Sequence, residues 1–158
     1  MTFQPNDDRE LVLDLLLDAP REKIYRAWTD PELLKQWFVP APWGYAALCE
    51  LDVRPGGKFR TVMRAHEGGE EYDNNGVFLE VVPNEKLVTT DAFHAGWVPS
   101  AKPFMTATLL FSDEDGKTRY RVRCSHWTIE DRQTHEQMGF HDGWTLVANQ
   151  LADLARTL

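Results

Sequence analysis

Apolar residues recur at every second position near the start of the chain, and the period then changes. Leu11, Leu13, Leu15 and Leu17 alternate with Val12, Asp14 and Leu16. This period of two is that of a strand with one buried face. Pro20 and Asp30 stand where a first helical residue and an N-cap are expected. The apolar residues after them are spaced three and four apart, which predicts two short helices: Ile24, Ala27 and Trp28 in the first, and Leu33, Leu34, Trp37 and Phe38 in the second.

Strands and turns are predicted between about residues 45 and 127. On one face of the first of these strands lie Ala47, Cys49, Leu51 and Val53. A tight turn at residues 55–57 leads into the second, whose matching face carries Phe59, Thr61 and Met63. Four further strands are expected at residues 72–82, 86–93, 105–111 and 118–127. Such successive hairpins favour an antiparallel sheet.

The last of these strands alternates most regularly. Arg119, Arg121 and Arg123 occupy every second position, and apolar residues lie between them. We expect the arginines to face water and the intervening residues, with His126, to face the interior.

The period changes again in the C-terminal part of the chain. A long amphipathic helix is predicted by the spacing of Trp144, Val147, Ala148, Leu151, Leu154, Ala155 and Leu158. Residues 134–137, THEQ, have the form of a capping box. Gly139 and Gly143 each cost about 1 kcal/mol in a helix relative to Ala. Either the helix begins only near Asp142, or close packing requires the glycines.

These elements can be assembled on physical grounds into one domain, residues 1–158, of the α+β class. Two short helices follow the first strand, and the antiparallel sheet has six to seven strands. This sheet has an apolar face to cover, and the C-terminal helix carries the long apolar stripe, so we expect the sheet to curl around it. A strongly curved sheet and one helix leave space between them, which favours a concave apolar pocket.

Three segments carry a resemblance to a known family. They are residues 19–38, APREKIYRAWTDPELLKQWF, residues 54–60, RPGGKFR, and the late pair Gly143-Trp144. In their order and spacing the sequence resembles the SRPBCC (START/Bet v 1-like) superfamily, in the branch similar to the C-terminal half of the activator of heat shock protein 90 ATPase. The resemblance spans nearly the whole chain and implies a helix-grip fold with a ligand-sized cavity.

Strand parity and helix faces select the residues expected to line this cavity. Aromatic side chains offer stacking surfaces to a flat or aliphatic ligand. Large apolar residues are also the ordinary material of protein cores, and the sequence leaves both interpretations open. The predicted ligand-binding residues are Trp37, Phe38, Phe59, Met63, Phe78, Phe93, Tyr120, His126, Met138, His141 and Trp144.

Few polar residues have a spacing that suggests chemistry. His126 lies on the inward strand face, where a neutral imidazole could act as a general base or anchor a ligand carbonyl. Buried histidines also commonly do no chemistry. His135 and His141 are six positions apart rather than four, so we expect no metal site. We predict no catalytic residue and no cofactor.

Composition limits the partners and the location. The 158 residues, 42% of them apolar, suffice for one core, and the net charge is −8. We expect no nucleic-acid and no membrane partner, because Lys and Arg supply most of the binding to phosphates. The N-terminal residues lack the pattern of a signal peptide, which predicts a cytoplasmic location. The two cysteines have no C-x-x-C spacing, and we expect no disulfide.

The function expected from these observations is binding of a small hydrophobic or aromatic molecule in the internal cavity. One alternative is an enzyme of the cyclase/aromatase or hydrolase type, as some superfamily members are, with His126, His141 or Tyr72 as acid or base. Another is a chaperone-associated protein-binding module. The activator carries an additional N-terminal domain, whereas the first strand here begins near Leu11, so we do not expect a chaperone partner. Homodimers occur in this branch of the family, and a sheet edge or the loop 92–104 could supply the interface.

Overall fold

The computed structural model describes residues 2–158. In chain order its elements are β1 (Glu10–Leu17), α1 (Arg21–Thr29), α2 (Pro31–Trp37), β2 (Gly44–Leu51), β3 (Lys58–Ala65), β4 (Glu71–Val82), β5 (Lys86–Thr90), β6 (Phe93–His94), β7 (Val98–Pro99), β8 (Met105–Glu114), β9 (Lys117–His126), α3 (Ile129–Gln137) and α4 (Phe140–Ala155). The predicted α+β class is confirmed.

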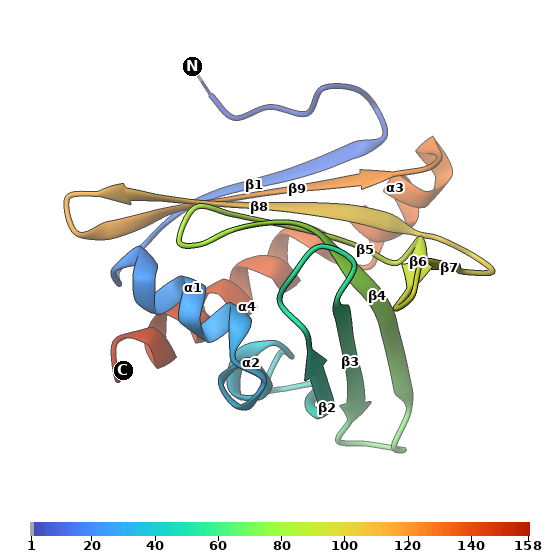
Figure 1. Ribbon diagram of the computed structural model, residues 1–158, viewed down its shortest axis with the longest axis horizontal. Coiled ribbons are helices and arrows are strands. Elements are labelled where there is room, and N and C mark those ends of the chain that lie inside the picture. Colours follow the sequence, from blue (N-terminus) through green and yellow to red (C-terminus); the bar gives the residue numbers. More distant parts are fainter. Residues whose placement is uncertain (1) are drawn as a thin grey trace.

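Seven strands form one antiparallel sheet in the order β1-β9-β8-β5-β4-β3-β2. In Figure 1, β1, β9 and β8 run across the top of the molecule, whereas β2, β3 and β4 turn downward at the right. α1, α2 and α4 lie in the angle between these two parts (Figure 1). The curled sheet therefore holds the C-terminal helix on its concave side, which we call the inner face, and the predicted helix-grip arrangement is confirmed.

The two short helices begin where local signals place them. The side chain of Asp30 accepts a hydrogen bond from the backbone N–H of Glu32 at 3.0 Å, and Pro31 is the first residue of α2. Pro20 is the N-cap of α1 rather than its first residue as predicted, and its side chain makes no capping hydrogen bond. The buried residues of α1 and α2, which include Trp28 and Trp37, face the sheet and α4.

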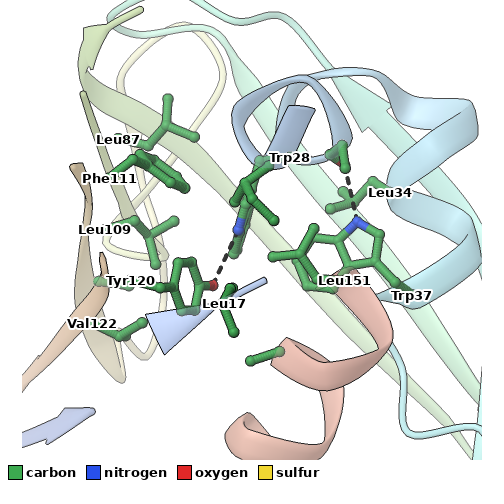
Figure 2. Packing of buried hydrophobic residues seen from close by; sticks show 14 of the residues in the cluster. Leu17, Trp28, Leu34, Trp37, Leu87, Leu109, Phe111, Tyr120, Val122 and Leu151 are labelled. Carbon is green, nitrogen blue, oxygen red and sulfur yellow. Dashed lines mark hydrogen bonds between the residues drawn. The ribbon is translucent and has the colours of Figure 1, made fainter. Parts of the chain in front are cut away.

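The core forms where the helices meet the inner face. Inward residues of β1 and β9 lie opposite one another, as Leu13 and Val122 do. Figure 2 shows Trp28, Trp37 and Leu151 packed against a wall of strand residues that includes Tyr120. The indole Nε1 of Trp37 donates a hydrogen bond to the carbonyl oxygen of Ala27 at 3.0 Å, which joins α2 to α1. The indole of Trp37 is thus held in the core by a hydrogen bond as well as by packing.

One strand departs from the predicted alternation. The pairing of β2 with β3 shifts between Ala46 and Leu48, so that Ala46 lies opposite Met63, and Cys49 lies opposite Thr61. Ala46 rather than Ala47 therefore shares the inner face with Cys49. A β-bulge inserts one residue and moves the next side chains to the other face, which is why simple alternation was wrong at Ala47.

The C-terminal region contains two helices, and the predicted capping box at residues 134–137 is wrong. The N-cap of α3 is Thr128, whose hydroxyl accepts a hydrogen bond from the backbone N–H of Asp131 at 3.0 Å. Thr134 lies inside this helix. α4 begins at Phe140, directly after Gly139, whose φ of 91° lies in the left-handed region that glycine adopts readily. Gly143 lies inside α4, and a Cβ there would meet nothing within 4 Å, so close packing does not require it.

Two strand predictions need adjustment. The strand predicted at 86–93 ends at Thr90, and Phe93 begins a separate two-stranded ribbon made of β6 and β7. The arginines of β9 lie on the outer face as predicted, but Arg123 is covered: its side chain is 19% exposed, and its Nη1 lies 2.7 Å from Glu10 Oε1. Its guanidinium also lies 4.7 Å from the ring centroid of Phe3.

Candidate functional site

Three of the predicted ligand-binding residues are core residues. Trp37, Phe78 and Tyr120 are each at most 1% exposed. Trp28, which was not predicted as a site residue, links Trp37 to Tyr120: its ring centroid lies 5.0 Å from that of Trp37, and its Nε1 donates to the Tyr120 hydroxyl at 3.1 Å. These side chains form the packed floor of the inner face.

Other predicted residues face the same side but are only partly buried. They lie on β3 and α4, and two neighbours that the sequence analysis did not select share this property. We call the set the open inner face: Phe59, Met63, Met105, Trp144 and Val147. The sequence contains signals that could have identified the other two residues, Met105 and Val147. Met105 pairs with the inward-facing His126, and Val147 lies three positions after Trp144 on α4.

The remaining apolar candidates lie elsewhere. Phe38 is partly buried at the end of α2, with its ring centroid 5.7 Å from that of Trp28 and 6.1 Å from that of Phe59, at the border of the core. Phe93 packs edge-on against Trp97 in the β6–β7 ribbon, at a centroid distance of 5.6 Å. Met138 is 70% exposed between α3 and α4. The structure does not bring Phe93 and Met138 onto the open inner face.

The most organised polar group is a pair of buried histidines. Nδ1 of His126 lies 2.8 Å from the carbonyl oxygen of Arg9, and its Nε2 lies 2.9 Å from Nδ1 of His135. His126 comes from β9 and His135 from α3, and both side chains are buried. His135 was not predicted as a site residue. Its role as the partner of His126 depends on how α3 packs on β9.

Aromatic rings surround the second histidine. The ring centroid of His135 lies 5.3 Å from that of Phe104, 5.1 Å from that of Phe140 and 6.5 Å from that of Trp144. Burial lowers the pKa of His135 to about 4, and the nearby His126 contributes to this shift. The ring of His135 is therefore neutral at neutral pH, and one edge of the open inner face carries an uncharged imidazole.

The other acid–base candidates do not join this pair. The side chain of His141 is 56% exposed, and its Nε2 lies 4.0 Å from Glu136 Oε2. Tyr72 lies opposite Met63 on the inner face but is 45% exposed, and its hydroxyl donates to Glu70 at 2.7 Å. That hydrogen bond raises the pKa of Tyr72. Both groups are in contact with solvent rather than with His126.

Two open hollows lie outside this region. One, of about 200 Å³, is lined by outer-face and N-terminal residues that include Glu10, Ser125 and the edge of His126. The other, of about 380 Å³, lies near the turn before β3 and is lined by side chains of both charges, such as Asp52 and Lys58. Charged rims of this kind suit apolar ligands poorly. Neither hollow is lined by a residue of the open inner face.

Within residues 2–158, no three His, Cys, Asp or Glu side chains are grouped as metal ligands. None of the helices in this range is long and apolar enough to cross a membrane. Cys49 and Cys124 are both free thiols in buried positions.

Solved structures show the same fold over nearly the whole chain. A protein from Nitrosomonas europaea is 38% identical to this chain, with 97% of both chains covered and a TM-score of 0.91. One from Mycobacterium smegmatis is 25% identical, with a TM-score of 0.78 and coverage of 94% of this chain and 91% of its own. An AHSA1-like protein from Aeromonas hydrophila, at 18% identity, has a TM-score of 0.71 and coverage of 94% and 92%, which shows the fold alone.

The family follows from a match along the sequence. No protein of curated function matches this chain significantly. The model of the family described as "Activator of Hsp90 ATPase homolog 1-like protein" matches residues 18–156, in agreement with the predicted resemblance. This chain therefore belongs to the Activator of Hsp90 ATPase homolog 1-like protein family.

Proposed function

We propose that this protein binds a small hydrophobic or aromatic molecule between the inner face of its sheet and α4. The observation that carries the proposal is the open inner face. Its five apolar side chains, three from strands and two from α4, lie on the concave side of the sheet but are only partly buried, unlike Trp37 and Phe78 on the same side. Apolar surface that the protein's own packing leaves accessible gains about 25 cal/mol per Å² when a ligand covers it.

The polar groups beside this surface also favour an apolar ligand. Thr61 is fully buried, and its hydroxyl oxygen accepts a hydrogen bond from Asn74 Nδ2 at 3.3 Å. Its inner-face neighbours on β3 are Phe59 and Met63. Small-molecule sites are mostly apolar, with a few polar groups that orient the ligand. The wall formed by β3 fits this description.

Ligand binding can be tested by following tryptophan fluorescence, because Trp144 belongs to the open inner face. The protein would be titrated at pH 8 with small aromatic probes, of which 2-naphthol and 2-methoxynaphthalene are suitable. Native mass spectrometry of the purified protein would reveal any molecule already bound. We expect saturable binding of one probe molecule per chain.

A matched pair of charge substitutions locates the site. Met63→Asp places a carboxylate on the open inner face and should weaken binding at least about tenfold, because an apolar ligand would have to desolvate it. Val98→Asp makes the same change on β7, where Val98 is 54% exposed, and should leave binding unchanged. Failure of both aromatic probes to bind, or equal binding by the Met63→Asp variant, would contradict the proposal.

A further inference from the structure

The hydrogen bonds of the histidine pair determine where the hydrogens lie. The carbonyl oxygen of Arg9 can only accept a hydrogen bond, so Nδ1 of His126, 2.8 Å away, must carry a hydrogen. In a neutral imidazole the other nitrogen is then an acceptor. Nε2 of His126 therefore accepts from His135, whose Nδ1 lies 2.9 Å away and must carry the donated hydrogen.

The outermost nitrogen of the pair is Nε2 of His135. Because Nδ1 of neutral His135 carries its hydrogen, Nε2 of this ring has a lone pair and no hydrogen. The backbone of Arg9 thus determines, through His126, that His135 presents an acceptor at Nε2. Burial lowers the pKa of His135 to about 4, and at pH 8 an imidazole is in its neutral form.

This nitrogen is available to a ligand. None of residues 2–158 forms a hydrogen bond with Nε2 of His135. Four side-chain atoms of these residues are fully buried without a partner, and Nε2 of His135 is not one of them. The rings of Phe104, Phe140 and Trp144 pack against the ring of His135, and Phe104 and Trp144 are themselves only partly buried. The ring that carries Nε2 therefore lies among aromatic side chains, one of which, Trp144, belongs to the open inner face.

We propose that His135 is the polar anchor of the ligand site, and that its Nε2 accepts a hydrogen bond from a hydroxyl or N–H group on a small aromatic molecule. His126 is a positioning residue, which orients the ring of His135 and selects its tautomer. This inference rests on the proposed binding function and narrows it to ligands that combine a flat apolar body with one hydrogen-bond donor, as phenols do.

Two probes that differ in a single donor test the anchor. 2-Naphthol and 2-methoxynaphthalene share the aromatic body, but only 2-naphthol can donate a hydrogen bond. At pH 8 we expect 2-naphthol to bind about tenfold more tightly, the usual effect of one hydrogen bond whose loss leaves an acceptor unpaired. In the His135→Phe variant, which keeps a ring of similar size, the two probes should bind equally. His66→Phe, which changes an exposed histidine, should retain the preference.

The tautomers can be measured without any ligand. Long-range ¹H–¹⁵N correlation spectra of the protein labelled with ¹⁵N-histidine, at pH 8, distinguish the two ring nitrogens. We expect Nδ1 of both His126 and His135 to carry the hydrogen. A hydrogen on Nε2 of His135 would overturn the inference even if the His135→Phe variant did not fold.

The outcomes separate the two proposals. If both probes bind wild-type protein with equal affinity, the anchor is wrong and the binding function stands. If neither probe binds, the binding function fails for aromatic compounds, and the anchor fails with it.

Discussion

The indole Nε1 of Trp28 donates a hydrogen bond to the hydroxyl oxygen of Tyr120 at 3.1 Å, which ties α1 to β9 inside the core (Figure 2). Trp28 is 2% exposed and Tyr120 1%. Burial raises the pKa of Tyr120 far above its usual range, so the hydroxyl keeps its hydrogen. Two large side chains thus combine apolar packing with a satisfied polar contact.

Removal of this hydroxyl should destabilise the fold. In Tyr120→Phe the indole N–H of Trp28 is left buried without a partner, and we expect the free energy of unfolding to fall by about 1–2 kcal/mol. Urea denaturation followed by circular dichroism measures the change. Tyr25→Phe is the matched control, because the Tyr25 hydroxyl forms no hydrogen bond with residues 2–158. A Tyr25→Phe variant as destabilised as Tyr120→Phe would argue against this role of the hydrogen bond.

Two glycines should respond in opposite directions to alanine. A Cβ at Gly76 would lie 2.2 Å from the carbonyl oxygen of Thr90, in the neighbouring strand. We expect Gly76→Ala to destabilise the protein by about 3 kcal/mol or more, because strand backbone must move. At Gly143 the Cβ meets nothing within 4 Å, and Ala should stabilise α4 by about 0.5–1 kcal/mol. Thermal unfolding of the two variants would refute this account if both shifted the same way.

The buried histidine predicts a pH dependence of stability. The pKa of His135 is about 4 in the folded protein, compared with an ordinary value of 6.5. Between these pH values the unfolded chain binds the extra proton, so this contribution is complete above pH 6.5 and is lost as the pH falls towards 4. The full difference corresponds to about 3 kcal/mol.

The His135→Gln variant isolates this contribution. The ionisable groups outside position 135 are the same in both proteins, so their contributions largely cancel in the comparison. Urea denaturation from pH 4 to pH 8 should show wild-type stability falling more steeply with acid than that of the variant. Parallel pH profiles would show that His135 titrates normally.

Both thiols should be unreactive in the folded protein. Burial raises the pKa of the Cys49 thiol to about 11 and that of Cys124 further still. Alkylation requires the thiolate, so iodoacetamide at pH 8 should leave both residues unmodified and should label both in urea. Mass spectrometry of the intact protein counts the added groups. Fast labelling of Cys49 without urea would indicate that the edge strand β2 opens locally.

Local patterns were enough to predict most elements. The alternation from Leu11 to Leu17 predicted β1, Asp30 predicted the start of α2, and the stripe after Trp144 predicted α4. Each of these signals lies within a few residues of the element that it describes. The capping pattern at residue 134 misled because the same kind of signal occurs at Thr128, and the helix that begins there buries His135.

Side-chain identities along the chain predicted most of the strand residues that face inward, but not which of them are covered. Phe59 and Phe78 both lie on the inner face, yet only Phe78 is fully buried. The burial of each side chain depends on the positions of α1, α2 and α4 over the sheet. These positions are determined by the packing of segments that are far apart in sequence.

The histidine pair depends on tertiary contacts in the same way. His126 and His135 belong to elements of different period, and no spacing rule relates a strand position to a helix position. Their contact exists because α3 packs on β9, and the tautomer of His135 depends further on a carbonyl oxygen in the N-terminal segment. The short-range pattern thus established the elements and the fold class. The open inner face and the histidine pair arise from long-range packing, because burial and hydrogen bonding depend on every segment that surrounds a residue.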